Sequence, residues 1–272
     1  MIASFAIAAL VACAACLIYL RIHGVVYVGR TAAGLTIVHD DTKVMGERIR
    51  VLEVDGTYQS ATYLDTRWAD LVFPYHGTFE HLFDAWPAGG GPTSIAVLGG
   101  GGYAVPKHLV VHHPEVAQID VVEIDPAIER IARRHFFVDR LETCFGAESS
   151  GRLRLHIADA RTWLEENAQR YDAIINDCFF GLEPEMSLVT QEAAELICRH
   201  LTGEGLYLTN VVSALRGQDS GILRATLSSL RGPFSYLWLY PGSPDDPYAR
   251  DNIVVIASNV RHEFAGAWEH NE

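Results

Sequence analysis

A run of four glycines is the feature whose residue type and spacing most directly suggest a chemistry. The run, Gly99-Gly100-Gly101-Gly102, comes straight after a short apolar segment. Glycine adopts positive φ at little cost and lets the backbone approach a ligand closely. Because Gly99, Gly101 and Ala104 match the pattern G-x-G-x-x-G/A, the run predicts a nucleotide-binding turn between a strand and a helix.

Three acidic residues at the ends of later apolar runs would complete a nucleoside site. Glu123 follows Ala104 by about 20 residues, the spacing at which an acid accepts hydrogen bonds from ribose hydroxyls. A carboxylate at Asp159 could accept a bond from an adenine amino group, with the neighbouring backbone as a second contact. Asp177 ends the following run and should lie over the same crevice, because ligands of such folds bind at the C-terminal strand ends.

The class of nucleotide is a separate question. A nicotinamide dehydrogenase would need the same glycine turn, but we find no convincing hydride-transfer pair, and Lys107 is the only lysine after the turn. An acid at the end of each of three successive strands suits ligands of the S-adenosylmethionine type better.

The elements that would position these residues follow from the apolar pattern. Seven short, β-branched apolar runs alternate with helical segments at 126–137, 160–169 and 191–201. Such runs are typical of strands buried on both faces of a mainly parallel sheet. We predict an α/β fold with a Rossmann-like, doubly wound sheet whose seven strands lie at 95–99, 119–124, 153–157, 173–177, 206–212, 236–240 and 253–257.

A smaller unit precedes this sheet. Residues 25–65 contain short alternating runs, and Asp55-Gly56 between two of them is a hairpin signal. A helix is expected from about residue 74 to 85, before the break at 89–92. We therefore predict a small antiparallel β domain at 25–70 and a nucleoside-binding catalytic domain at 71–272.

The first 24 residues form a hydrophobic segment. Residues 2–20 carry no charge and would span roughly 28 Å as a helix, so they predict a membrane anchor. Arg21 and Arg30 follow the segment, which would place the catalytic domain in the cytoplasm. The alternative is export after signal cleavage, since Leu10-Val11-Ala12-Cys13 looks like a lipoprotein cleavage box, although no positive charge precedes it.

Charge and cysteine content exclude other classes of protein. The chain has 21 Lys plus Arg against 34 Asp plus Glu, a net charge of −13, which argues against nucleic-acid binding. The five cysteines form no disulfide framework. Cys13 and Cys16 have CxxC spacing but no second pair or histidine nearby, so we expect no metal.

The succession of motifs resembles the spermidine synthase family, whose members transfer aminopropyl groups from decarboxylated S-adenosylmethionine. The resemblance covers roughly residues 34–258. It is carried by Leu52-Glu-Val-Asp-Gly-Thr-Tyr-Gln-Ser60, Phe73-Pro-Tyr-His76, the glycine turn, Val122-Glu-Ile-Asp-Pro126, Asp159 and Asp177.

The resemblance implies a role for individual residues. Asp177 matches the aspartate that orients and deprotonates the attacking amine. The nucleoside contacts implied are Gln59, Glu123, and Asp159 with Ala160. Tyr75 and His76 match a pair at the junction of the amine and nucleoside sites, and Tyr240 matches a tyrosine near the amine.

Two positions depart from the family pattern. Gly102 stands where the family has an aspartate for the amino group of the transferred chain, and Phe180 where it has one that grips the diamine. Each loss removes a charge-assisted hydrogen bond worth ~1.5–3 kcal/mol. Glu183, Glu185 and Asp219 are the acids that could substitute.

We therefore expect a transferase that moves an aminopropyl or methyl group to an amine acceptor, using S-adenosylmethionine or its decarboxylated form. Because Gly102 removes an acid that would repel the carboxylate of intact S-adenosylmethionine, this form should be tolerated. The alternative is a non-catalytic, membrane-anchored sensor of a nucleoside or polyamine. Family members often form dimers, so a homodimer is the assembly to test.

Overall fold

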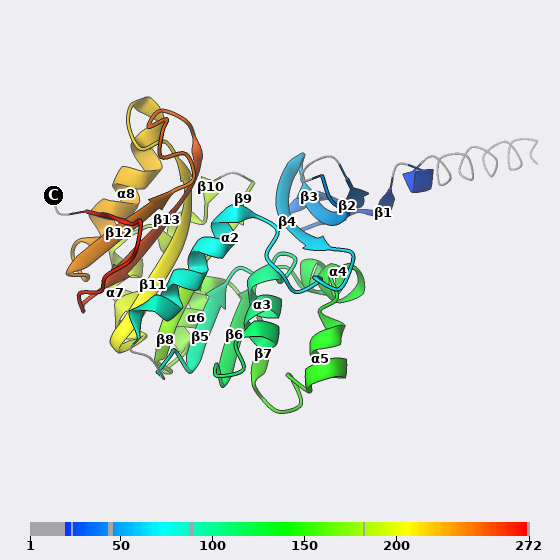
Figure 1. The fold of residues 1–272 in the computed structure, drawn as a ribbon, viewed down its shortest axis with the longest axis horizontal. Coiled ribbons are helices and arrows are strands. Elements are labelled where there is room, and N and C mark those ends of the chain that lie inside the picture. Colours follow the sequence, from blue (N-terminus) through cyan, green and yellow to red (C-terminus); the bar gives the residue numbers. More distant parts are fainter. Residues whose placement is uncertain (1–19, 23, 43–45, 87–89, 182, 271–272) are drawn as a thin grey trace, which may run out of the picture.

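The computed structural model describes residues 20–270 except 23, 43–45, 87–89 and 182. Within them, an eight-stranded mixed sheet has the strand order β14-β12-β13-β11-β8-β5-β6-β7 (Figure 1). Five strands are parallel: β5 (Ser94–Leu98), β6 (Gln118–Glu123), β7 (Leu153–Ile157), β8 (Tyr171–Asn176) and β11 (Leu201–Ser213). The antiparallel β13 (Asp251–Ser258) pairs with β11 and with β12 (Tyr236–Pro241), and β14 (Trp268–Glu269) pairs with the outer edge of β12.

The seven predicted strands are thus confirmed, and β14 is added at the edge. The missed strand has two residues, both exposed, so it carries none of the apolar pattern that identified the others.

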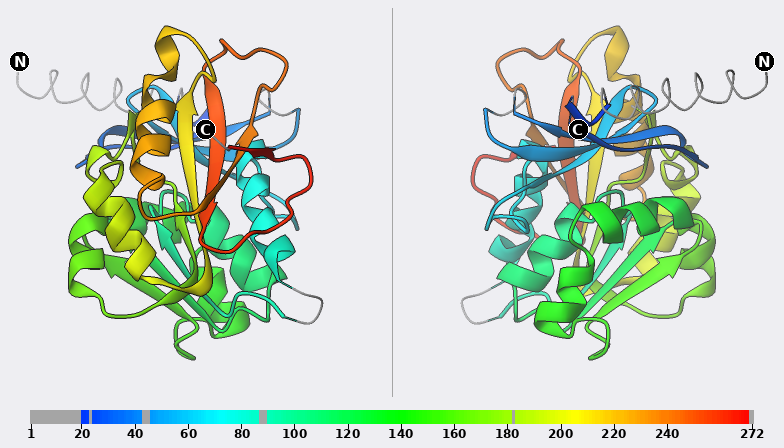
Figure 2. Two further views of the ribbon diagram at one scale, coloured as in Figure 1. Left: turned by 90° about the vertical axis from the view of Figure 1, so that its left-hand side faces the viewer. Right: turned by 90° about the vertical axis from the view of Figure 1, so that its right-hand side faces the viewer.

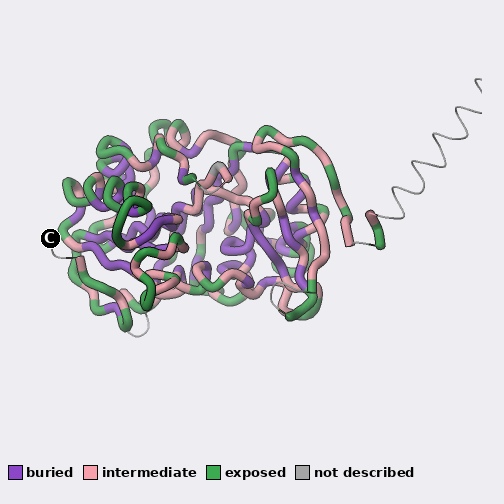
Figure 3. The backbone as a smooth tube through the Cα atoms, turned by 90° about the horizontal axis from the view of Figure 1, so that it is seen from above, coloured by how far each residue is buried: buried purple, intermediate pink, exposed green. Residues whose placement is uncertain are grey.

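Helices cover both faces of this sheet, as the alternation of buried side chains along β5 requires. Figure 2 shows the helices on the two sides of the sheet. Ile95 and Val97 belong to one hydrophobic core, whereas Ala96 and Leu98 belong to a second. The first core includes residues from α3 (Ala104–His112), α4 (Pro126–His135) and α5 (Asp139–Phe145). The second includes residues from α6 (Ala160–Glu166), α7 (Gln191–Arg199) and α8 (Gly221–Leu230). Figure 3 shows these buried stretches running through the middle of the molecule.

A separate four-stranded antiparallel sheet precedes the large one, in the order β1-β2-β3-β4. Its strands are β1 (Val25–Thr31), β2 (Gly34–Asp41), β3 (Ile49–Val54) and β4 (Thr57–Tyr63). The predicted hairpin at Asp55-Gly56 is formed, with φ of 47° and 82° at these two residues, as its tight turn requires. Val38 and Leu52 join the first core of the large sheet, so the small sheet packs on it. The domain boundaries at residues 24 and 70 stay a prediction.

Short elements connect β4 of the small sheet to β5 of the large sheet, and others follow β8 and β11. The helix expected at 74–85 is an α-helical turn, α2 (Pro74–Thr78), followed by a 3-10 helix, η1 (Phe79–Ala85). The remaining elements are β9 (Phe179–Phe180), β10 (Glu183–Pro184), η2 (Met186–Leu188) and η3 (Gln218–Ser220).

The membrane anchor predicted at residues 2–20 has to be corrected. No helix in the part of the chain that the structure describes is long and apolar enough to cross a bilayer. Residues 2–19, on which both the anchor and the alternative export signal depend, lie outside the described residues. The predicted membrane attachment, and the localisation inferred from it, are therefore not supported.

Candidate active site

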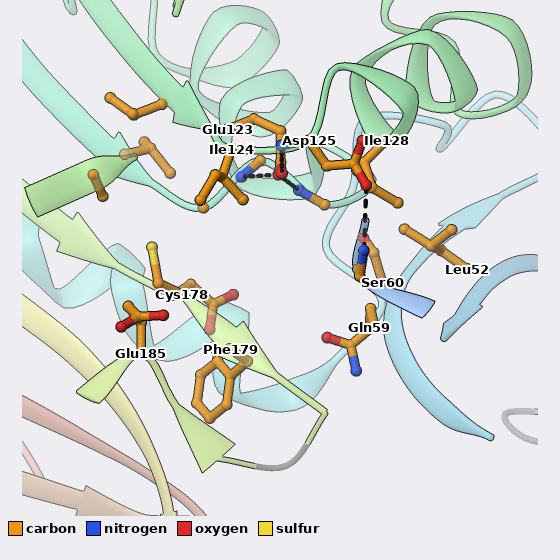
Figure 4. Close-up of a pocket in the computed structure, with 18 of the residues that line it drawn as sticks. Leu52, Gln59, Ser60, Glu123, Ile124, Asp125, Ile128, Cys178, Phe179 and Glu185 are labelled. Atoms are coloured by element: carbon orange, nitrogen blue, oxygen red, sulfur yellow. Dashed lines mark hydrogen bonds between the residues drawn. The ribbon is translucent and has the colours of Figure 1, made fainter. Parts of the chain in front are cut away.

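A cavity of about 390 Å³ lies where the C-terminal ends of β5, β6, β7 and β8 meet the small sheet. Figure 4 shows Glu123 and Asp125 on one side of it, with Cys178, Phe179 and Glu185 on another and Gln59 and Ser60 on a third. The predicted site residues that line it are Gln59, His76, Gly99, Gly100, Gly101, Glu123, Asp159, Ala160 and Asp177.

The glycine turn packs closely against the end of the neighbouring strand. Gly99 has φ of 93°, and a Cβ there would lie 2.6 Å from the backbone oxygen of Asp177. A side chain at Gly99 would therefore strain the backbone and push the two strand ends apart. Position 99 therefore requires glycine, because of its positive φ and the close approach of the backbone, as the glycine pattern predicted.

Glu123 holds this turn through backbone hydrogen bonds. Its Oε2 accepts from the N–H groups of Gly100 and Gly101, both at 3.0 Å, and its Oε1 accepts from Asp125 at 2.9 Å. Burial raises the pKa of the Glu123 carboxyl, although these backbone hydrogen bonds oppose the rise. The acid is thus fixed at the edge of the cavity.

Asp125 and Asp159 lie at the starts of helices. Asp125 caps α4 by accepting from Ala127 at 2.7 Å, and Asp159 caps α6 by accepting from Thr162 at 2.8 Å. Asp125 also accepts from the N–H of Ala32 at 2.7 Å, in the turn between β1 and β2. It therefore fastens the small sheet to the cavity, a role that no local pattern around Asp125 predicted.

Asp177 is held by three side chains. Its Oδ2 accepts from the Tyr75 hydroxyl and from His76 Nε2, both at 3.1 Å, and its Oδ1 accepts from Asn210 Nδ2 at 3.1 Å. Burial, together with the nearby Asp177 charge, raises the pKa of Tyr75 well above its ordinary value, so Tyr75 stays protonated and donates. Asn210 was not among the site residues predicted from the sequence. The one indication there is that Asn210 is a polar residue within the apolar strand β11.

Gln59 lies in the cavity, whereas Tyr240 does not line it. Gln59 Nε2 donates to the Gly181 carbonyl at 3.2 Å, which joins the small sheet to the segment after β8. Tyr240 stacks on His81 with ring centroids 4.3 Å apart and donates to the Ala265 carbonyl at 3.1 Å. The structure therefore does not bring Tyr240 together with the other predicted site residues.

The structure places the first of the two departures from the family pattern. Gly102 is buried and does not line the cavity, and a Cβ there would lie 2.5 Å from Ser60 Oγ. The side chain of Phe180 lies outside the described residues. Of the acids that could substitute, Glu185 lines the cavity, while Glu183 pairs with Arg250 at 2.7 Å and Asp219 is not among the lining residues.

The residue after Gly102 does not block the turn. Tyr103 adopts φ of 56°, is fully buried in the first core and is not among the residues that line the cavity. Lys107, four residues later, is also buried and donates to Thr62 Oγ1 at 2.9 Å. Although the two residues have the spacing of a Tyr-x-x-x-Lys pair, neither faces the nucleoside site.

The charge of the cavity is one-sided. Its lining includes the carboxylates of Glu123, Asp125, Asp159, Asp177 and Glu185, and no Lys or Arg among the described residues. His76 is the one basic side chain in that lining. Such a site favours a positively charged ligand.

Comparison with known proteins agrees with this geometry. The profile of the spermine/spermidine synthase domain matches residues 73–220, more than half of the chain. The chain belongs to this family. It is 32% identical over 197 residues to a polyamine aminopropyltransferase of Vibrio vulnificus, covering 71% of this chain and 58% of that one. It is 30% identical over 234 residues to polyamine aminopropyltransferase 2 of Hyperthermus butylicus, covering 79% and 72%.

Solved structures confirm the fold of this family member. A probable spermidine synthase from Corynebacterium glutamicum superposes with a TM-score of 0.72 at 19% identity, covering 88% of this chain and 82% of that one. Human methyltransferase-like protein 13 in complex with SAH superposes with a TM-score of 0.55 at 23% identity, covering 72% and 86%. The fold is thus the Rossmann-like methyltransferase type that we predicted.

The resemblance stated from the sequence is confirmed, and the names of the relatives are those of transferases. The chain spans only 18 to 58% of the length of four of the curated relatives that it matches.

Proposed function

We propose that this chain is an aminopropyltransferase that uses decarboxylated S-adenosylmethionine as the donor and an amine as the acceptor. The observation that carries the proposal is the charge of the cavity, which has five carboxylates and no Lys or Arg in its described lining. A sulfonium donor and a protonated amine are both cations, so this lining suits both. The names of the curated relatives point to the same activity.

The cavity also suits the nucleoside part of the donor. A volume of about 390 Å³ lies in the range of small-molecule sites, ~300–1,000 Å³. Glu123 would bind the ribose hydroxyls, Asp159 and Ala160 would contact the adenine, and Gln59 would add a further nucleoside contact. All four residues line the same cavity as Asp177.

Asp177 would act as the base. The acceptor nitrogen attacks the carbon next to the sulfonium sulfur, a C–N bond forms as the C–S bond breaks, and methylthioadenosine leaves as a neutral thioether. The proton released by the amine passes to Asp177. An ionised carboxylate has about four lone-pair positions, and Tyr75, His76 and Asn210 use three. One position therefore stays available for the amine.

The side chains near Asp177 bear on whether the acceptor is a monoamine or a diamine. Phe180 replaces the family acid that grips a diamine, and Phe179 lines the cavity. Glu185 lines the same cavity, and its backbone N–H donates to the Cys178 carbonyl at 2.9 Å, so Glu185 lies next to the residue that follows Asp177. Glu185 is thus the acid that could bind the second ammonium group of a diamine, and a comparison of monoamines with diamines as acceptors tests whether it does.

The donor preference needs a separate measurement. Gly102 brings no carboxylate to the tail of the donor, and a Cβ there would lie 2.5 Å from Ser60 Oγ, so the acid by which the family contacts the amino group of the transferred chain is absent from this position. We therefore expect calorimetric titration to detect binding of both intact and decarboxylated S-adenosylmethionine.

The test of the activity is an assay with each donor and a panel of monoamines and diamines. Release of methylthioadenosine with the decarboxylated donor supports the proposal. Release of S-adenosylhomocysteine with the intact donor alone would make the protein a methyltransferase. Binding of both donors with no turnover would contradict the proposal and favour a sensor. Light scattering of the same preparation tests the homodimer.

A further inference from the structure

A cluster of histidines and carboxylates lies outside the cavity, between η1 and α3. Glu80 of η1 contacts two imidazoles, with Oε1 3.1 Å from His108 Nε2 and Oε2 2.9 Å from His113 Nε2. The three ligand-type atoms all lie within 4.8 Å of one another. The side chains are 39%, 15% and 15% exposed, so the cluster is half-buried and open to small ions.

The Nδ1 atom of each imidazole, on the side away from Glu80, already has a hydrogen-bond partner. His108 Nδ1 lies 3.3 Å from the Ala69 carbonyl, and His113 Nδ1 lies 2.9 Å from Glu115 Oε1. A proton on Nδ1 satisfies each of these acceptors and leaves the Nε2 lone pair directed at Glu80. Carbonyl or carboxylate partners of this kind orient the histidine ligands of metal sites.

Packing fixes the second imidazole as well. The ring of Phe83 stacks on His113, with centroids 3.7 Å apart and planes 7° apart. The Nε2 of His113 is therefore oriented before any ion arrives, and less freedom is lost on binding.

We propose that Glu80, His108 and His113 form a binding site for a divalent transition-metal ion, with Zn²⁺ as the best match. Two imidazole nitrogens and one carboxylate oxygen are a common zinc ligand set, and water would fill the fourth position. The sequence predicted no metal because these ligands come from two segments that only the fold brings together.

An overlapping set shares one of these histidines. Asp70 and His112 lie 2.9 Å apart and could bind an ion together with His108. Their side chains are both 41% exposed, and no hydrogen bond fixes the second nitrogen of His112 among the described contacts. We therefore assign the ion to the more buried set, and His112 supplies a matched control.

The site would join two segments that also line or support the cavity. Glu80 follows His76 by four residues along α2 and η1, and α3 begins directly after the glycine turn. An ion bound to Glu80 and to both histidines would hold η1 against the C-terminal end of α3. This consequence does not depend on the proposed activity.

The experiment uses the full chain, freed of metal by chelation, with Cys13 and Cys16 replaced by Ser so that their CxxC spacing binds no zinc. Zn²⁺ is titrated by calorimetry, and Co²⁺ is titrated by its visible absorption. We expect one ion per chain, a dissociation constant of about 10 µM or below, and a melting temperature raised by about 5 °C at saturation. Glu80→Gln and His113→Asn should each weaken binding at least tenfold, and Glu115→Gln about tenfold.

Control variants separate this site from others. His112→Asn and His39→Asn should leave the affinity within about twofold, and circular dichroism of the metal-free variants checks that each is folded. No saturable binding below 100 µM Zn²⁺ would overturn the proposal and leave the cluster as a set of ion pairs. Loss of binding in His112→Asn, with binding kept in His113→Asn, would also overturn it.

Discussion

The two ends of the cavity hold their carboxylates in different ways. At the nucleoside end, Glu123, Asp125 and Asp159 all accept hydrogen bonds from backbone N–H groups. At the amine end, the described partners of the Asp177 carboxylate are all side chains, those of Tyr75, His76 and Asn210. The acids of the nucleoside end are therefore fixed by the main chain, whereas Asp177 at the amine end is held by side chains.

This difference predicts how the ends respond to mutation. A backbone-bound acid takes part in turns and helix starts, so its removal should change ligand affinity or stability. An acid held by side chains can lose its charge while the main chain stays in place, so its removal should act on turnover. Each variant below tests one side of this contrast.

The largest effect is expected for Asp177→Asn. The amide cannot accept the amine proton, so we expect turnover to fall about 10²- to 10⁴-fold. Donor affinity should fall much less than turnover, because the nucleoside part of the donor would bind at the other end, beside Glu123 and Asp159. Methylthioadenosine release and calorimetry measure the two quantities. A variant with near-normal turnover would remove Asp177 as the base.

A smaller effect, on affinity, is expected for Glu123→Gln. Hydrogen bonds to a charged group contribute about 1.5–3 kcal/mol, so the donor should bind about 10- to 100-fold more weakly. Asp172→Asn is the matched control, because Asp172 also accepts from backbone N–H groups, those of Thr93 and Ser94, but outside the cavity. Equal losses in both variants would mean that a general loss of structure, and not a lost ligand contact, weakens binding.

Tyr75→Phe should have a smaller effect on the amine end. Removal of one donor loosens Asp177 without changing its charge, so we expect kcat to fall about tenfold with little change in donor affinity. Tyr171→Phe is the control, since its hydroxyl donates to Asp120 at 3.2 Å, away from the cavity. A donor affinity that fell as much as kcat would contradict the division between the two ends.

The smallest effect is expected for Asp125→Ala at the nucleoside end. Loss of the helix cap should lower the free energy of unfolding by about 1 kcal/mol at neutral pH. Burial alone would raise the pKa of Asp125. Backbone hydrogen bonds from Ala127, Ala32 and Ala33 outweigh this effect and lower the pKa below 3.8. The difference from wild type should therefore persist above pH 3.8 and disappear as the pH falls through the lower folded value.

Denaturant titrations at a series of pH values measure this difference. Asp139→Ala serves as the control, since Asp139 stands in the first turn of α5 and pairs with Arg133 through an exposed carboxylate, a kind of contact that contributes little to stability. A stability difference for Asp125→Ala that grew on acidification would contradict the assignment.

The parts that could be predicted from sequence are those fixed by local pattern. Seven strands, the hairpin at Asp55-Gly56 and the glycine turn follow from periodicity and from the φ angles that glycine allows. The positions of Glu123, Asp159 and Asp177 in one cavity follow from a single rule, that parallel strand ends meet at one edge.

The rest depends on contacts between distant segments. Asn210 meets Asp177 from another strand, and Asp125 binds the turn at Ala32, a pairing that no local pattern encodes. Tyr240 matches a position in the family motif, but its ring stacks on His81 and is not among the residues that line the cavity, so its contact with the amine stays a prediction. The packing around Gly102 likewise became visible only when Ser60 of the small sheet was placed.

The central claim is that one adenosyl compound spans both ends of the cavity. A crystal structure of the chain with methylthioadenosine tests it most directly. We expect the ribose hydroxyls within hydrogen-bond distance of Glu123, the adenine beside Asp159 and the sulfur facing Asp177. A nucleoside bound elsewhere, or one whose sulfur points away from Asp177, would contradict the account.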